Sequence, residues 1–68
     1  MPIINVDMWK GISQEHIETI IEGITKVFTD MGIPQEAVQV IIREVPKAHW
    51  GIDGQPATKS RKDAGMSK

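Results

Sequence analysis

The sequence predicts an α+β fold, in which one β-α-β unit with parallel strands is followed by a short C-terminal hairpin. Two changes of hydrophobic period indicate this fold. Apolar and polar side chains alternate over residues 4–8, as in a strand with one buried face, and from residue 17 apolar side chains recur every three or four positions, as on a helix. A second apolar run, residues 38–45, completes the unit.

The first strand is expected directly after Pro2. Its alternating apolar positions are Ile4, Val6 and Met8, and Asn5 and Asp7 lie between them. Lys10 and Gly11 break the alternation, so the strand is expected to end there. A proline as the first residue of a strand is allowed, because a residue at that position need not donate a ladder hydrogen bond.

The helix is expected from Ser13 to just before Gly32. Ser13 is the predicted N-cap and Gly32 the predicted C′ residue, with Pro34 preventing continuation. Many residues between them are β-branched and favour strands by intrinsic propensity, but the helical period extends over too many residues for a strand. The predicted buried stripe consists of Ile17, Ile20, Ile21, Ile24, Val27, Phe28 and Met31.

The run "VQVIIREV" is nearly continuous in apolar residues, which predicts a strand buried on both sides for much of its length. The turn-rich stretch "PKAHWGIDGQP" that follows predicts a short hairpin or arm, a candidate to lie over a neighbouring subunit. We therefore divide the chain into a domain over residues 1–56, hairpin included, and a basic, partly disordered C-terminal tail over residues 57–68.

Composition excludes several classes of protein. A chain of 68 residues with no cysteine has neither disulfides nor thiolate zinc sites to supplement a small core, so oligomerisation is the expected way to enlarge it. His16 and His49 are far apart and lack ligand-like neighbours, so we expect no metal and no cofactor. The net charge of −1 and the lack of aromatic residues in the basic tail argue against nucleic acid as a partner. With no apolar run long enough to span a bilayer and no leader, we expect a cytoplasmic protein that does not bind membranes.

Several features together resemble the 4-oxalocrotonate tautomerase family. They are Pro2 directly after Met1, Gly11 at the turn and the run "VIIREVPKAHWGIDG", and the similarity extends to about Arg61. The resemblance implies a β-α-β protomer that forms dimers and assembles as a trimer of dimers, a homohexamer with active sites at subunit boundaries. It also implies that Met1 is removed and that the freed amine of Pro2 is the catalytic base.

The chemistry suits such a base. Moving a proton between an enol and a keto form requires one group to accept the proton and then return it elsewhere on the conjugated system, which works best when its pKa lies near the working pH. An N-terminal amine ordinarily titrates slightly above neutrality, and apolar surroundings or a nearby cation lower its pKa. If Met1 is retained, the Pro2 nitrogen is an amide and has no basic lone pair.

Two positions depart from the family pattern. Members that act on dicarboxylate dienols carry arginines where this chain has Ile12 and Gln39, and neither side chain replaces a bidentate guanidinium. Trp50 stands at the family's aromatic position, either covering the base or packing in a dimer. Arg43 lies about 13 Å along the strand from Gln39, too far to replace an arginine there within one site. In an oligomer, Arg43 is a candidate to reach a neighbouring site. Trp9 is a candidate either to contact substrate or to anchor an interface, and Arg61 is a further candidate to contact substrate. Lys10, Lys47 and Lys59 are other available cations, and Asp7 and Glu44 either orient such a cation or pair with one on the surface.

The leading hypothesis is a tautomerase that moves a proton between the enol and keto forms of a 2-oxo acid, a 2-hydroxymuconate-like dienol or a less charged analogue. A hydratase, dehalogenase or decarboxylase of the same superfamily would need the same base. A non-catalytic chain, or a partner subunit of a hetero-oligomeric tautomerase, is favoured by the loss of both arginines and disfavoured by the retention of Pro2.

Overall fold

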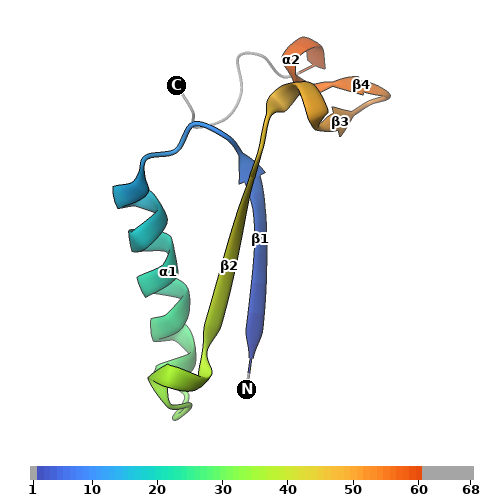
Figure 1. The fold of residues 1–68 in the computed structure, drawn as a ribbon. Coiled ribbons are helices and arrows are strands. Elements are labelled where there is room, and N and C mark those ends of the chain that lie inside the picture. Colours follow the sequence, from blue (N-terminus) through green and yellow to red (C-terminus); the bar gives the residue numbers. More distant parts are fainter. Residues whose placement is uncertain (1, 61–68) are drawn as a thin grey trace.

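The computed structural model describes residues 2–60. Its body is a two-stranded parallel sheet of β1 (Ile3–Trp9) and β2 (Gln39–Val45), connected through helix α1 (Gln14–Thr29). Figure 1 shows α1 running alongside the two strands. The β-α-β unit and its parallel strands are therefore confirmed.

The two strands pair in register over their whole length. The ladder runs from Ile3 opposite Gln39 to Trp9 opposite Val45. One further bond extends it at the N-terminal end, where the backbone amide of Gln39 donates to the carbonyl of Pro2 at 3.1 Å. Pro2 therefore belongs to the sheet although it precedes the first strand residue.

The predicted alternation in β1 is confirmed. Along the strand, half-buried side chains alternate with exposed ones, as expected when one face of a sheet carries a helix and the other does not. The half-buried positions include Ile4, Val6 and Met8, and the exposed positions are Ile3, Asn5 and Asp7.

Both predicted ends of α1 are found. The side chain of Ser13 accepts a hydrogen bond from a backbone amide of the first turn at 3.2 Å. At the other end, Gly32 donates to the carbonyl of Thr29 at 3.0 Å and Ile33 donates to that of Phe28 at 3.2 Å. These two bonds form a Schellman motif, in which the C′ residue adopts a left-handed conformation, and Gly32 has a φ of 95°.

The predicted buried stripe of α1 is only partly correct. Five of its members are half-buried: Ile17, Ile20, Ile21, Ile24 and Phe28. Val27 and Met31 are instead 58% and 69% exposed. Two strands about 4.8 Å apart form a sheet narrower than the stripe, so positions at the edge of the stripe find nothing to pack against within the chain.

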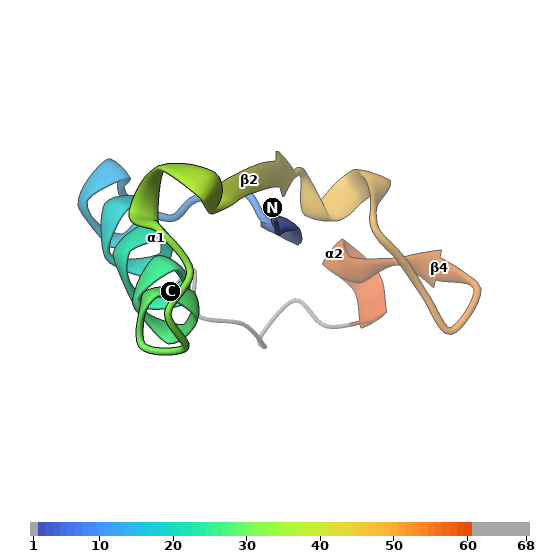
Figure 2. The same cartoon turned by 90° about the horizontal axis from the view of Figure 1, so that it is seen from below.

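The prediction that β2 is buried on both sides is wrong for the single chain. Ile41 of β2 is 42% exposed and Ile3 of β1 is 54% exposed, although both are apolar. They share the sheet face opposite α1, which within residues 2–60 is covered only at the end where the arm packs against Trp9 (Figure 2). We call this surface the open face, and its other members are Asn5, Asp7, Gln39 and Arg43.

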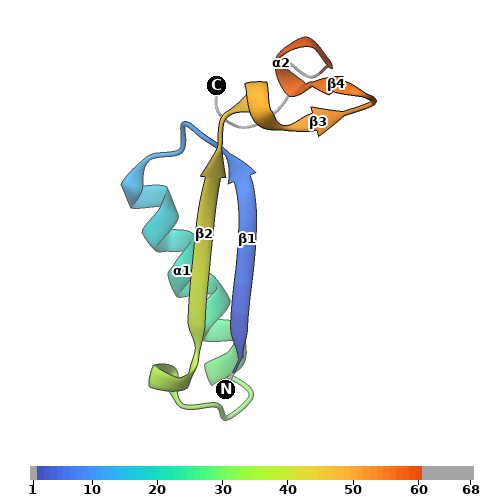
Figure 3. The ribbon, with the colours of Figure 1, turned by 45° about the vertical axis from the view of Figure 1, so that its right-hand side comes forward.

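The segment after β2 forms the predicted hairpin, and we refer to residues 46–60 as the arm. It contains the 3₁₀ helix η2 (Lys47–His49), the antiparallel strands β3 (Gly51–Ile52) and β4 (Gln55–Pro56), and helix α2 (Ala57–Ser60). Figure 3 shows the arm extending from the end of β2, away from α1. A second 3₁₀ helix, η1 (Gln35–Ala37), precedes β2.

The arm carries the only buried residue among the described side chains. Ala57, the first residue of α2, is fully buried, and its amide donates to the carbonyl of Trp50 at 2.7 Å. This helical turn at the start of the predicted tail was not predicted from the sequence. The rest of that tail, residues 61–68, lies outside the described residues.

Candidate active site

The N-terminus lies at the end of the sheet where α1 finishes (Figure 3), and Pro2 has a half-exposed side chain. The Pro2 carbonyl accepts a hydrogen bond from the Gln39 amide at 3.1 Å, so the carbonyl of Pro2 takes part in the ladder. A proline nitrogen carries no hydrogen for a ladder bond. The nitrogen of Pro2 is therefore not required by the sheet.

Gln39 is the candidate site residue that the structure brings next to Pro2. It is the first residue of β2, it is exposed, and it lies opposite Ile3 in the ladder. Its side chain is a neutral amide at a position where the family resemblance leads one to expect a guanidinium. The Pro2 end of the sheet therefore has no cationic side chain at this position.

Arg43 lies further along the same strand and is engaged with another residue. Its guanidinium Nη1 lies 3.7 Å from the Asp7 carboxylate, with both side chains slightly more than half exposed. The predicted pairing of Asp7 with a cation is confirmed. Arg43 lies four residue steps from Gln39 on the same strand, which at about 3.3 Å per step places these two positions about 13 Å apart within one chain.

The remaining described candidates lie at the opposite end of the sheet. The rings of Trp9 and Trp50 meet edge to face, with centroids 6.0 Å apart and an interplanar angle of 78°. The ammonium of Lys47 lies over the Trp9 ring, 4.8 Å from its centroid. Trp9 ends β1, and Trp50 and Lys47 belong to the arm, so this cluster joins the arm to the sheet.

Ile12 also lies at the arm end, in the turn between β1 and α1. The turn is held by Gly11, whose amide donates to Glu44 Oε1 at 3.2 Å. Gly11 has a φ of 118°, a backbone conformation that side-chain-bearing residues rarely adopt. Glu44 therefore fixes the backbone beside Ile12, a role that sequence reasoning left open.

One chain does not bring its candidate residues into one site. Seven residue steps separate Pro2 from Trp9, which at about 3.3 Å each corresponds to about 23 Å. Pro2 and Gln39 thus lie at one end of the sheet, with Trp9, Ile12 and Trp50 at the other. Arg61 lies outside the described residues, so its predicted role stays a prediction.

The remaining described residues show no second candidate for a catalytic or metal site. His49 is exposed in η2, as expected of a loop histidine. Within residues 2–60 there is no group of three potential metal-ligating side chains, and none of the helices there has the length and hydropathy needed to cross a membrane.

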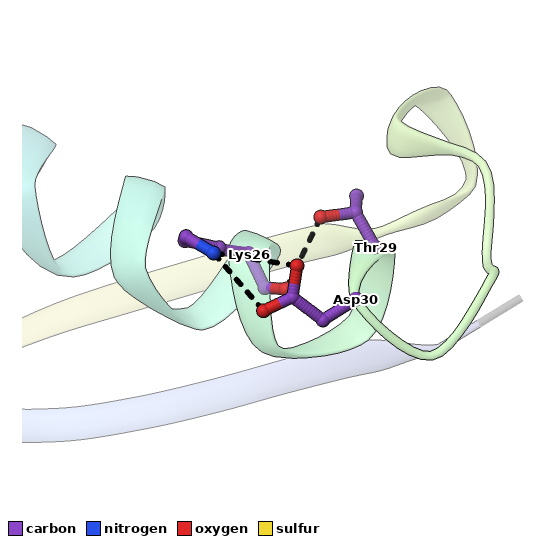
Figure 4. A network of polar contacts seen from close by, with 3 residues as sticks. All are labelled: Lys26, Thr29 and Asp30. Atoms are coloured by element: carbon purple, nitrogen blue, oxygen red, sulfur yellow. Dashed lines mark hydrogen bonds and ion pairs between the residues drawn. The ribbon is translucent and has the colours of Figure 1, made fainter.

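A groove of about 260 Å³ lies between α1 and η1. None of the candidate residues lines it: its walls are Ile21, Glu22, Thr25, Lys26, Thr29 and Gln35. Figure 4 shows the polar contacts at this end of α1, where Lys26 pairs with Asp30 at 3.0 Å and Thr29 donates to a backbone carbonyl. These are local contacts that stabilise a helix end rather than a built binding site.

Comparison with known proteins identifies the family. The family model described as "Tautomerase enzyme" matches residues 2–60. The chain belongs to the 4-oxalocrotonate tautomerase family of the tautomerase superfamily. As a family member it is a tautomerase, an isomerase like 2-hydroxymuconate tautomerase.

The similarity extends over nearly the whole length of its relatives. A 2-hydroxymuconate tautomerase of Pseudomonas putida is 42% identical over 60 residues, covering 87% of this chain and 95% of the relative. A probable tautomerase of Ralstonia nicotianae is 38% identical over 69 residues, covering 100% of this chain and 99% of the relative. The crystal structure of TomN, a 4-oxalocrotonate tautomerase homologue in the tomaymycin biosynthetic pathway, superposes with a TM-score of 0.83 at 30% identity, covering 91% of this chain and 97% of that one.

Sequence reasoning named the candidate site residues one by one but missed how they group. It treated Trp9, Lys47 and Trp50 as separate candidates, whereas the structure places them in one cluster. The available signal was an aromatic residue at the end of a strand together with another just before a hairpin glycine. That signal says nothing about the angle between the arm and the sheet, on which the contact depends.

Proposed function

We propose that this chain catalyses the transfer of a proton between the enol and keto forms of a 2-oxo acid, with the N-terminal amine of Pro2 as general base. The amine forms when Met1 is removed. It takes the proton from the enol oxygen, the electron pair moves through the conjugated system as the carbonyl forms, and the protonated amine returns the proton to a carbon of that system. No proton is gained or lost overall.

The observation that supports this proposal best is the position of Pro2. Its carbonyl is fixed by the Gln39 amide, while its nitrogen is left outside the ladder at a half-exposed strand end. The proline ring fixes φ, so the amine is held without the ordering of a long side chain. A base with these properties is rigid and accessible to a small substrate.

We further propose that each active site is built from more than one copy of the chain, in a dimer that assembles further into a hexamer. Ile3 and Ile41 leave the open face partly apolar, and no side chain of residues 2–45 is buried in the single chain. Since Pro2 and Trp50 lie at opposite ends of one chain, Trp50 reaches a Pro2 amine only on a neighbouring copy.

The lack of cations at Ile12 and Gln39 supports a substrate that carries fewer carboxylates than a dicarboxylate dienol. A guanidinium binds a carboxylate through two charge-assisted hydrogen bonds, which neither isoleucine nor glutamine provides. We therefore expect a monoacid dienol to be turned over with a higher kcat/KM than the matching diacid.

The test is an enol-to-keto assay with a monoacid and a diacid dienol, followed by absorbance. Protein shown by mass spectrometry to begin at Pro2 is compared with a Pro2→Ala variant and with protein that retains Met1. We expect both modified proteins to lose about a hundredfold or more in kcat/KM. Activity that is equal in all three proteins would contradict the general base, and native mass spectrometry of the same samples tests the assembly.

A further inference from the structure

We infer that Trp9 is a positioning residue that fixes the arm, and with it the ring of Trp50, relative to the sheet. The inference rests on the proposed function in one respect: Trp50 affects the reaction because it closes the site around Pro2 of a neighbouring copy. Trp9 itself is not required to touch the substrate. Its role is to hold the residue that does.

The arm is held together by its own backbone hydrogen bonds. The amide of Ala57 donates to the carbonyl of Trp50 at 2.7 Å, and the amide of Trp50 donates to the carbonyl of Lys47 at 3.2 Å. Strands β3 and β4 pair between these points. Because these bonds connect its beginning to its end, the arm is expected to move as one unit relative to the sheet.

Two side-chain contacts between this unit and the sheet meet on one ring. The edge-to-face contact with Trp50 and the cation–π contact with Lys47 both involve Trp9, the last residue of β1. Lys47 is the first residue of η2 and Trp50 directly follows its last residue, so the ring contacts the arm through two different side chains. Contact at two points fixes an angle, whereas one point would allow rotation.

The indole nitrogen shows which property of Trp9 matters. Trp9 Nε1 is buried and finds no hydrogen-bond partner among the described residues. A buried donor without a partner is unfavourable, so hydrogen bonding does not explain a tryptophan at this position. The aromatic surface is what the arm uses, and phenylalanine is therefore expected to replace Trp9 where leucine does not.

The decisive experiment is a double-mutant cycle on kcat/KM with the better dienol substrate. We expect Trp9→Leu to lose about tenfold and Trp9→Phe to stay within about threefold of the unmodified chain. In a Trp50→Leu background, Trp9→Leu should change the rate by less than about threefold, because a residue that acts through Trp50 has nothing left to position. A tenfold loss in both backgrounds, or an equal loss for Trp9→Phe, would overturn the inference.

A second measurement needs no catalysis and so separates this inference from the proposed function. The Trp9→Leu and Trp9→Phe variants each keep Trp50 as their single tryptophan, so its fluorescence reports the same ring in both. We expect acrylamide to quench Trp50 at least about twofold more effectively in Trp9→Leu, since the loosened ring is more open to solvent. Equal quenching rejects the inference, whereas a chain with no Pro2-dependent activity but unequal quenching rejects only the proposed function.

Controls distinguish positioning from general loss of structure. Val27→Ala removes a 58% exposed apolar group from α1, far from the arm, and should leave both rate and quenching unchanged. Far-UV circular dichroism and native mass spectrometry show whether each variant folds and assembles. If Trp9→Leu fails either control, Trp9→Met replaces it, since methionine keeps the bulk of the side chain without the aromatic ring, and the same two outcomes decide.

Discussion

The body, residues 2–45, and the arm, residues 46–60, differ in where their apolar side chains go. The body has long, regular elements with clear hydrophobic periods, yet none of its side chains is buried in the single chain. The arm has only short elements, yet it contains the fully buried Ala57. A clear pattern therefore shows which face of an element is apolar, but not that the same chain covers it.

The two regions also hold different parts of the proposed site. Pro2 and Gln39 meet at the free end of the body, whereas Trp50 lies in the arm against Trp9 at the other end of the sheet. In the proposed assembly, a neighbouring copy both covers the open face and brings Trp50 to a Pro2 amine. The following predictions test this link between the two regions.

The largest effect is expected from a charge on the open face. Ile41→Asp places a carboxylate where we propose that another copy packs, and burying an unpaired charge is strongly unfavourable. We expect the assembly to dissociate at micromolar concentration and kcat/KM to fall by about a hundredfold or more, as for loss of the base itself. Sedimentation velocity and the dienol assay measure the two effects.

Val27→Asp is the matched control for this prediction. Val27 is 58% exposed, somewhat more than the 42% of Ile41, but it lies on α1 rather than on the open face. Its variant should keep both the assembly and the activity. A monomeric Ile41→Asp chain with full activity would show that one copy suffices. It would contradict the proposal that Trp50 of one copy completes the site around Pro2 of another.

The next largest effect is expected beside Pro2. Gln39→Arg restores a guanidinium at the end of the sheet, where it provides a bidentate partner for a second carboxylate. We expect the ratio of kcat/KM for diacid over monoacid dienol to rise about tenfold. Gln35→Arg adds the same charge in η1 and should leave the ratio unchanged, while an unchanged ratio in Gln39→Arg itself would mean that this side chain does not reach the substrate.

Features set by local interactions could be predicted from the sequence, whereas features set by contacts between distant parts could not. The cap at Ser13 and the left-handed Gly32 follow from local hydrogen bonding, and both are found as predicted. Ile41 and Met31 were expected to be buried but are exposed, because nothing within residues 2–60 packs against them closely enough to bury them. The contact between Trp9 and Trp50 was not predicted, since it depends on how the arm leaves the sheet and not on any period in the sequence.

A smaller effect is expected at the end of α1, within the body. Gly32→Ala puts a side chain on a residue with a φ of 95°, which costs about 1 kcal/mol of unfolding free energy. A Cβ there would have open space around it, so the cost arises from the backbone alone. Gly23→Ala, inside α1 and equally open, should instead stabilise by about 0.5–1 kcal/mol. Denaturant unfolding at one fixed protein concentration compares the two, and equal effects would contradict the Schellman assignment.

The smallest effect is expected at the outer surface of α1. Asp30→Asn removes the Lys26 ion pair, in which the two side chains are 73% and 65% exposed, and it also removes a negative charge that the helix C-terminus disfavours. The two contributions oppose each other, so we expect the unfolding free energy to change by at most about 0.5 kcal/mol, and by less at 1 M salt. A loss above about 1 kcal/mol that persists in salt would mean that another copy shields this pair from water. The surface covered by neighbours would then include the end of α1 with Val27 and Met31, and the exposure of these two residues would have the same cause as that of Ile41.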